Sequence, residues 1–389
     1  MSNNNWQVKS LGEVAKVKSG FAFKSEEYLN QGVPLVRIGS LNGSSLEFGN
    51  ETVFVEEKFL TTCREFSLKE NDVLIAMSGA TTGKLALVKQ KDLPCLLNQR
   101  VGLISIGSED VLNTKYLFYY LAKGDLRREV LKIAGGSAQP NISPTQIMSF
   151  QIPLPPLRIQ KQIVEILEQA DKAKQKRKEA NKLTDEFLQS VFIEMFGDPV
   201  KNPKSWEVRK FGEVTEIIMG QSPVGNSYNV IGEGVPLLNG PAEFGEKHPN
   251  EVQWTIQPTK YSKPNDILFC VRGATAGRMN WSDKEYCIGR GLASIRSNKK
   301  SLIEFIYFFL KLKYSQFQNM GQGSTFINLS KDLISSMRIC VPPISFQQKF
   351  AEIVNKTEEL KEKQKQSDQE LENLFQSLMQ KAFKGELVS

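Results

Sequence analysis

Residues 152–167, IPLPPLRIQKQIVEIL, and residues 339–354, ICVPPISFQQKFAEIV, are two copies of one segment that decides the fold. In both copies a Pro-Pro pair interrupts the preceding apolar stretch, because proline ends regular structure. Apolar residues then recur at spacings of three and four, which is typical of a helix that buries one face. The two segments therefore predict long helices over residues 159–194 and about 346–383.

The duplication extends over nearly the whole chain, from Trp6 and Trp206 onward. Two copies of nearly 200 residues are far longer than solenoid repeats, so they predict two complete domains. The matched blocks are, in order, LGEVAKVKSG (11–20) and FGEVTEIIMG (211–220), GVPLVRIG (32–39) and GVPLLNG (234–240), NDVLIAMSGATTGK (71–84) and NDILFCVRGATAGR (265–278), VGLISI (101–106) and RGLASI (290–295), and GSAQPNIS (136–143) and GSTFINLS (323–330).

The offset between the copies falls from 200 at Trp6 and Trp206 to 187 at Ile152 and Ile339. The copies therefore share their ends and apolar blocks, and they differ in the loops between them. We expect the shared positions to form the scaffold and the divergent loops to give the two domains different tasks.

Short β-branched blocks bounded by Gly, Asn, Pro or Ser predict strands in each copy, and residues 114–134 and 301–319 predict helices. The predicted fold class is α+β, with two similar mixed α/β domains in a pseudo-two-fold arrangement. An antiparallel pair of long helices, a coiled coil, is expected to separate them, because neither helix can hide its apolar stripe alone. Residues 159–194 would form a rod about 54 Å long.

The middle of the first long helix, DKAKQKRKEANK, has lost most of its apolar residues. Its cations would contact phosphates, or they would form a solvated or partner-contacting face. They are Lys172, Lys174, Lys176, Arg177 and Lys178.

The composition limits the class of protein. The 389 residues include 50 Lys and Arg against 43 Asp and Glu, a formal net charge of +7, which is basic but not histone-like. No apolar run approaches the roughly 18–20 residues of a membrane span, and the first ten residues do not resemble a secretory signal. The five cysteines lack C-x-x-C spacing, so we expect a cytoplasmic protein without disulfides or zinc.

Two related but unlike domains on a rigid spacer suit two separated half-sites on one DNA duplex, because major-groove faces recur every ~34 Å. Arg37 and Asn239 occupy the same place after the shared GVPL. Arginine pairs with guanine and asparagine with adenine, so this difference suits two base readers, although a charge at a strand end is an equally ordinary interpretation.

Other cations lie near the same blocks. Lys84 matches Arg278 after a Gly-rich turn, a place suited to phosphate contact, and Arg272 stands opposite Ser78. The candidate DNA-binding residues are Lys24, Arg37, Lys84, Arg100, Asn239, Arg272, Arg278 and Arg290.

Enzymatic motifs are poorly supported. GATTGK is one residue too short for a phosphate-binding loop and lacks the Ser or Thr that would hold magnesium, so it predicts a tight turn between strands. The single histidine, His248, has no nearby nucleophile motif, and a place in a surface turn is expected for it. FGDP (196–199) predicts the turn that stops the first long helix. No cofactor and no metal are predicted.

Together, the duplicated Pro-Pro-led helix, the helix end FLQSVFIEMFGDP and the repeated W…LGEV…SG…GVPL…GAT.GK domain closely resemble the specificity subunit of type I restriction-modification systems. The resemblance spans essentially the whole chain. It implies target-recognition domains at residues 1–156 and 199–343 and conserved helical regions at 157–198 and 344–389.

The resemblance further implies that the domains read a split, asymmetric double-stranded DNA sequence, and that the chain is not itself an enzyme. The helical regions would bind two modification subunits, which carry S-adenosylmethionine and the adenine methylation chemistry. Restriction subunits would join them for ATP-dependent cleavage. Two alternatives stay open: a DNA-modifying enzyme, either a methyltransferase or a nuclease with built-in recognition domains, and a structural adaptor that grips protein or glycan.

Overall fold

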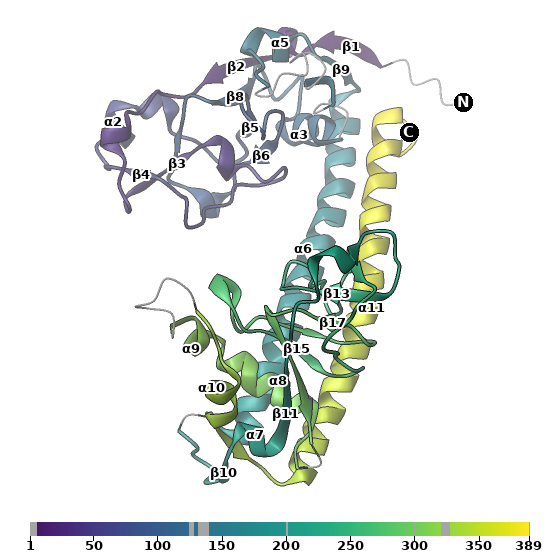
Figure 1. Cartoon of the computed structure of the whole chain (residues 1–389). Coiled ribbons are helices and arrows are strands. Elements are labelled where there is room, and N and C mark those ends of the chain that lie inside the picture. Colours follow the sequence, from purple (N-terminus) through teal and green to yellow (C-terminus); the bar gives the residue numbers. More distant parts are fainter. Residues whose placement is uncertain are drawn as a thin grey trace. The chain divides into compact units, whose positions relative to one another are not determined.

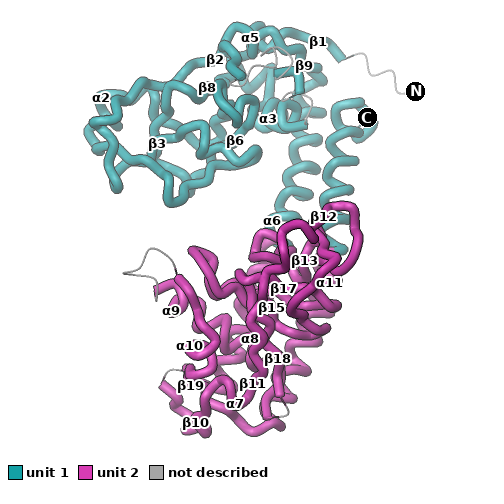
Figure 2. Tube along the Cα trace, in the orientation of Figure 1, with its two compact units in different colours: residues 1–177, 366–389 teal, residues 178–365 magenta. Residues whose placement is uncertain are grey.

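The computed structural model describes residues 6–123, 128–130, 140–199, 201–298, 300–319 and 327–388. The chain divides into two units (Figure 2). Unit 1 comprises residues 1–177 and 366–389, and unit 2 comprises residues 178–365. Unit 1 is thus built from two separate stretches of chain and unit 2 from one.

Each unit contains a four-stranded antiparallel sheet, and the strand order is the same in both. In unit 1 the order is β2 (Ala15–Ser19), β8 (Val101–Ile106), β5 (Val73–Ala76) and β6 (Leu85–Leu87). In unit 2 it is β11 (Thr215–Met219), β18 (Leu292–Ser297), β15 (Ile267–Cys270) and β16 (Met279–Trp281). Strands β5 and β15 are buried at every position, which explains their continuous apolar sequences VLIA and ILFC.

A smaller sheet accompanies the larger one, and it too occurs twice. In unit 1 its order is β4 (Phe54–Val55), β3 (Val33–Val36) and β7 (Leu96–Leu97). In unit 2 it is β12 (Tyr228–Asn229), β14 (Trp254–Thr255), β13 (Val235–Leu238) and β17 (Cys287–Ile288). The pairs β3 with β7 and β13 with β17 are parallel. The predicted duplication of a mixed α/β domain is therefore confirmed.

Short elements complete each unit. The antiparallel pairs β1 (Gln7–Ser10) with β9 (Gln151–Leu154) and β10 (Glu207–Lys210) with β19 (Arg338–Val341) lead into the long helices. The short helices are α1 (Leu11–Val14), α2 (Phe59–Thr62), α3 (Thr114–Ala122), α5 (Pro144–Met148), α7 (Phe211–Val214), α8 (Ile303–Leu312), α9 (Tyr314–Asn319) and α10 (Lys331–Ser336). The helix predicted over 301–319 is interrupted at Lys313, and of the one predicted over 114–134, residues 124–127 and 131–134 lie outside the described residues.

The strand pairing corrects one block of the internal alignment. Val101 pairs with Ala76 in unit 1, and Leu292 pairs with Cys270 in unit 2. Val101 is therefore equivalent to Leu292, two residues beyond Arg290, with which the sequence match had aligned it. Side chains in a strand alternate with a period of two, so a slip of two residues keeps every side chain on its face and the apolar pattern fits either register.

The repeated dipeptide Asn-Asp before β5 and β15 forms a turn. Asn71 and Asn265 both have φ of 69°, a left-handed conformation that asparagine tolerates. The carboxylate of Asp72 accepts the Lys69 N–H at 2.7 Å, and burial raises the pKa of this carboxyl. Its counterpart Asp266 is almost fully buried and forms two hydrogen bonds with the Arg296 guanidinium. The two copies thus support the same turn with different electrostatics.

The long helices are α6 (Leu157–Phe196) and α11 (Ile344–Lys384) (Figure 1). Both begin directly after a Pro-Pro pair, and each ends at a left-handed glycine, Gly197 or Gly385, which confirms the stop predicted at FGDP. Among the described residues, none of the helices is long and apolar enough to cross a bilayer. The helix starts coincide with two predicted domain boundaries, whereas the units divide inside the helices.

The two helices pair antiparallel within each unit. In unit 1, Lys174 of α6 forms an ion pair with Glu372 of α11 at 2.6 Å. In unit 2 the Asp185 carboxylate contacts Lys361 at 2.6 Å, and the Phe192 ring packs on Phe350. Residue numbers rise along one helix as they fall along the other, as predicted. The contacts of Lys174 also show that at least one mid-helix cation serves the helix pair.

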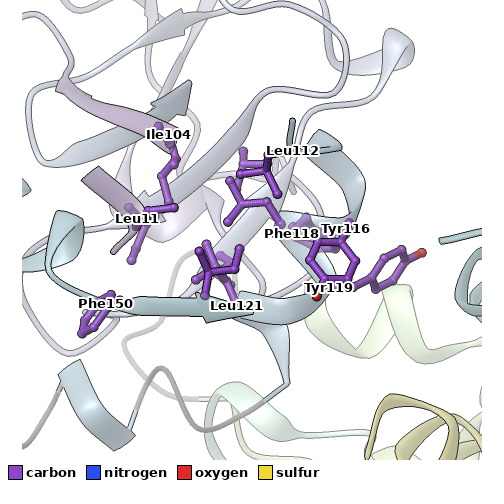
Figure 3. Close-up of a cluster of buried hydrophobic side chains, with 14 of the residues drawn as sticks. Leu11, Ile104, Leu112, Tyr116, Phe118, Tyr119, Leu121 and Phe150 are labelled. Carbon is purple, nitrogen blue, oxygen red and sulfur yellow. The ribbon is translucent and has the colours of Figure 1, made fainter. Parts of the chain in front are cut away.

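Each unit's core takes side chains from both long helices. Figure 3 shows Leu11, Ile104, Tyr116 and Phe150 gathered in the core of unit 1. The α6 and α11 residues in this core are Ile163, Val164, Leu167, Met379, Ala382 and Phe383. Unit 2 uses the opposite ends of the same helices, namely Leu188, Phe192 and Phe196 of α6 and Phe350 and Val354 of α11.

A buried glutamine fixes the start of each long helix. Gln160 is fully buried; its Oε1 accepts the Asn113 N–H at 2.8 Å, and its Nε2 donates to the carbonyls of Val111 and Pro155. Gln347 has the equivalent role in unit 2, where its Oε1 accepts from Ser301 and Leu302 and its Nε2 donates to Pro342. Each glutamine thus gives hydrogen-bond partners to three polar groups, most of them in the backbone, around the start of its helix.

We predict that Gln160→Leu lowers the free energy of unfolding of unit 1 by roughly 2–4 kcal/mol, because three backbone groups, one of them fully buried, lose their hydrogen-bond partner. Hydrogen exchange should accelerate in unit 1 and stay unchanged around Gln347. Gln169→Leu changes an exposed residue of the same helix and serves as the control. Equal effects of the two substitutions would contradict this role for Gln160.

Candidate nucleic-acid interface

The ends of β2, β3 and β7 meet at one point of unit 1. We call it junction 1; it comprises residues 20–21, 36–37 and 97–100. The Phe21 N–H donates to the Leu97 carbonyl at 2.9 Å, and the Asn98 N–H donates to the last carbonyl of β3 at 3.1 Å. Arg37 and Arg100 therefore leave adjoining backbone segments, and both are exposed.

The same crossing occurs in unit 2. We call it junction 2; it comprises residues 220–222, 238–239 and 288–291. The Gln221 N–H donates to the Ile288 carbonyl at 2.9 Å, and the Gly289 N–H donates to the last carbonyl of β13 at 2.8 Å. Asn239 leaves this junction as Arg37 leaves the other. The exposed Arg290 also lies here, but in the corrected register it stands opposite Gln99, and Gly291 stands opposite Arg100.

A glycine makes each crossing possible. A Cβ on Gly20 would lie 2.4 Å from the Leu97 carbonyl oxygen, and one on Gly220 would lie 2.1 Å from that of Gly289. Backbone atoms cannot yield as a flexible side chain can, so only glycine lets the chains approach this closely. This explains why the repeated sequence block ends in glycine in both copies.

The predicted tight turns are confirmed, and they adjoin the junctions. The turn after β5 contains Gly79 and Gly83, both with positive φ, and Lys84 follows it. The turn after β15 contains Gly273 and Gly277 in the same conformation. Backbone hydrogen bonds from Met77 to Arg100 and from Val271 to Gly291 join these turns to junctions 1 and 2. Arg272 and Arg278, both exposed, flank the second turn.

Two predicted residues of unit 1 lie on exposed loops. Lys24 opens the 3₁₀ turn η1 (Ser25–Glu27), where its backbone N–H donates to Glu27 at 2.7 Å. Arg37 has its guanidinium 5.8 Å from the centre of the Tyr28 ring, and it borders a depression of about 460 Å³. Glu47 and Glu51 line the same depression. Arg37 is thus an exposed cation at a depression that two acidic residues also border.

Asn239 is placed differently from Arg37. It is half-buried, and its Nδ2 donates to the Gln253 Oε1 at 2.9 Å. Its Oδ1 packs so closely on Gly289 that a Cβ at that glycine would lie only 2.5 Å from it. Its amide is therefore oriented by Gln253 before any ligand arrives. His248, expected in a surface turn, is half-buried, and its Nδ1 lies 3.1 Å from the Trp281 carbonyl oxygen.

Sequence reasoning missed three groups at these places. Tyr28 had a usable signal, because Tyr228 repeats it at the offset of 200 that the preceding block also has. Gln253 had none, since its counterpart is Val53. Glu47 and Glu51 lie in a loop that differs between the copies, where internal comparison has nothing to align.

Comparison with known proteins finds a matching family and similar full-length relatives. Residues 3–184 and 203–373 match the family described as Type I restriction modification DNA specificity domain. The putative type I restriction enzyme MjaX specificity subunit of Methanocaldococcus jannaschii is 29% identical, with 98% of this chain and 94% of that protein covered. The type I restriction enzyme EcoBI specificity subunit of Escherichia coli is 26% identical, with 100% of this chain and 87% of that protein covered.

Solved structures are also similar. One chain, from a study of complex assembly and conformational transition of the type I R-M system, has a TM-score of 0.64 at 25% identity and covers 98% of both chains. The S subunit of the type I restriction-modification system of M. genitalium has a TM-score of 0.57 at 17% identity and covers 98% of this chain and 97% of that one. The second likeness concerns the fold alone.

We predict that Gly20→Ala disrupts junction 1, because the new Cβ meets backbone atoms, and costs about 1–3 kcal/mol of stability in unit 1. DNA binding should weaken in parallel, which titration with labelled duplex measures. Gly39→Ala is the matched control, since a Cβ there meets nothing within 4 Å. A normal junction 1 in the Gly20→Ala variant, seen as unchanged hydrogen exchange at Phe21 and Asn98, would refute the role of this glycine.

Proposed function

Because this chain belongs to the type I restriction-modification DNA specificity family, we propose that its two units read the two halves of one split DNA sequence. The pair of junctions carries this proposal. The same backbone crossing occurs twice and offers unlike side chains, Arg37 in one copy and Asn239 in the other. Two recognition domains with the same backbone crossing but different side chains suit a DNA site whose two halves differ in sequence.

Base recognition is assigned to these two positions. Arg37 would donate to the O6 and N7 atoms of a guanine. Asn239 would pair with an adenine; its Nδ2 has two hydrogens, so one is left for N7 when the other is bound to Gln253. Gln253 acts here as a positioning residue that holds the Asn239 amide in one orientation.

Six further cations are assigned to the phosphate backbone. None of them forms an ion pair with another described residue, so their charge is available to phosphates. Five of the six are exposed, and Lys84 is half-buried after its turn. The six are Lys24, Lys84, Arg100, Arg272, Arg278 and Arg290.

The long helices are assigned to spacing and assembly. Leu183 and Phe187 of α6 are 58% and 51% exposed, and Leu360 of α11 is 49% exposed, so the helix pair in unit 2 keeps apolar surface that a partner would cover. Two modification subunits are the expected partners, with restriction subunits joining the full complex. In this division of labour the modification subunits bind S-adenosylmethionine and methylate adenine, and this chain contributes no catalytic group.

We predict that Arg37→Ala relaxes recognition at one half-site only and that Asn239→Ala relaxes the other, each by roughly 1–3 kcal/mol against the correct base. Gln253→Ala should reproduce the Asn239→Ala effect more weakly. The measurement is binding to duplexes mutated in one half-site at a time, over a series of salt concentrations. Loss at both half-sites from either single substitution would show that the base readers are wrongly assigned.

The same preparations distinguish recognition from catalysis. The purified chain should bind DNA with a steep salt dependence and transfer no labelled methyl group until a modification subunit is added. Methylation by the chain alone would favour the modifying-enzyme alternative. Binding that ignores DNA sequence and salt would favour the adaptor alternative.

We predict that inserting seven residues, two helical turns, into both α6 and α11 lengthens the permitted gap between half-sites by about three base pairs. Seven residues add about 10 Å at 1.5 Å per residue, and base pairs are spaced about 3.4 Å apart. The preferred gap is read by binding to a set of duplexes of varied spacer length. An insertion in only one helix is the control and should impair folding; an unchanged gap after the double insertion would refute the spacer role.

A further inference from the structure

One loop of unit 2 connects the proposed adenine reader to a long helix. We call it the recognition loop; it comprises residues 239–253, between β13 and β14, so Asn239 and Gln253 are its two ends. Near its middle, the Lys247 Nζ lies 2.9 Å from a carboxylate oxygen of Glu358 on α11. The recognition loop is therefore attached to the helix pair as well as to the smaller sheet.

The contact with Glu358 belongs to a small network of charges. The Lys361 Nζ, three residues along α11, lies 3.4 Å from a Glu358 oxygen and 2.6 Å from an oxygen of Asp185 on α6. Burial raises the pKa of the Glu358 carboxyl, but its contacts with Lys247 and Lys361 outweigh burial and lower that pKa below the usual value. Glu358 is therefore ionised at neutral pH, and the network links the recognition loop to both helices.

A second ion pair between the loop and α11 is weaker. The Lys365 Nζ lies 2.8 Å from a Glu246 oxygen, but these side chains are 67% and 80% exposed. Lys247 and Glu358 are only 44% and 31% exposed. Water and salt screen an ion pair more as its exposure rises, so the contact between Lys247 and Glu358 contributes more to holding the loop.

The tip of the recognition loop is a tight turn around Lys247. The Gly245 N–H donates to the His248 carbonyl at 3.1 Å, and a Cβ on Gly245 would collide with that oxygen. The Lys247 carbonyl accepts the Trp281 N–H of β16 at 3.0 Å. The turn and this hydrogen bond together hold the backbone of Lys247 in place.

Glu243 joins the two sides of the loop next to the reader. Its carboxylate accepts the N–H of Gly240, which directly follows Asn239, at 3.0 Å. Its carbonyl accepts the Asn250 N–H at 2.7 Å. The two ends of the loop are joined in turn by the hydrogen bond between Asn239 and Gln253. Because the two sides are bonded at several places, a displacement of the tip would also displace Asn239.

Unit 1 repeats the helix position but not the contact. Asp171 of α6 stands at the offset of 187 from Glu358. Its carboxylate accepts instead from the Nε2 of Gln175, in the same helix, at 2.7 Å. The equivalent loop, residues 37–53, forms no ion pair with either long helix within the part of the chain that the structure describes. The attachment therefore belongs to the copy in which asparagine is the reader.

We propose that Lys247 and Glu358 are a positioning pair, which fixes the orientation of Asn239 through the recognition loop and so increases discrimination at the second half-site. The inference rests on the proposed function, because it takes Asn239 as a base reader. An amide that is held in one orientation pairs with adenine without reorganisation and cannot turn to suit another base. Arg37, whose loop lacks this attachment, would read its half-site independently of the pair.

Glu358→Gln tests the proposal, because glutamine keeps the size of the side chain and removes its charge. The full chain should be titrated with duplexes that are mutated in one half-site at a time. Discrimination at the second half-site should fall by roughly twofold to fivefold, the effect of one partly exposed ion pair, and discrimination at the first should not change. Glu358→Lys should cause a larger loss, and the added substitution Lys247→Glu should restore most of it.

Asp171→Asn in unit 1 is the matched control and should change discrimination at neither half-site. Unchanged discrimination in the Glu358→Gln variant, or a charge reversal that Lys247→Glu does not rescue, would overturn the inference and leave the proposed function intact. An equal loss of affinity for every duplex would also overturn it, since position would then not be involved. Absence of any sequence preference in the unmodified chain would overturn the proposed function and the inference with it.

Discussion

Each long helix has an apolar stripe wider than it can bury by itself, and this constraint organises the chain. The first part of α6 places Ile163 and Leu167 in one core, and its last part places Phe192 and Phe196 in the other. α11 does the same in reverse order. Both helices are therefore components of the recognition units rather than attachments to them, and the buried Gln160 and Gln347 fix where each one starts.

Comparison of the two copies distinguishes residues that maintain the backbone fold from residues that make the two units different. Gly20 and Gly220 are shared because no other residue permits the backbone approach at the junctions. Asn71 and Asn265 are shared for their left-handed turn. The residues that follow the junctions differ, and so do the loops after β12 and before β4. The two copies thus differ most in sequence at positions where the backbone conformation does not require a particular residue. These positions are also the ones where a ligand would be contacted.

The sequence was most informative where a physical requirement is local. Pro-Pro pairs and Gly197 predict the limits of α6, and the repeated Gly-rich turn predicts a hairpin, because these residues restrict their own backbone. It was least informative across space. The register of β18 was misaligned by two residues, since period-two patterns cannot detect such a slip. The hydrogen bond between Asn239 and Gln253 could not be predicted, because it joins residues next to the ends of β13 and β14 and the first copy has Arg37 and Val53 at these places.

Unit 2 is one uninterrupted stretch of the chain, from residue 178 to residue 365, and its two limits fall inside paired helices. A recombination event with one crossover in each helix would therefore transplant this reader whole, core included. The helical surfaces outside the crossovers would be retained. The first unit offers no such cassette, since its core also needs Met379, Ala382 and Phe383 of α11, from a second stretch of the chain. New specificities should consequently arise more readily by replacement of the second reader than of the first.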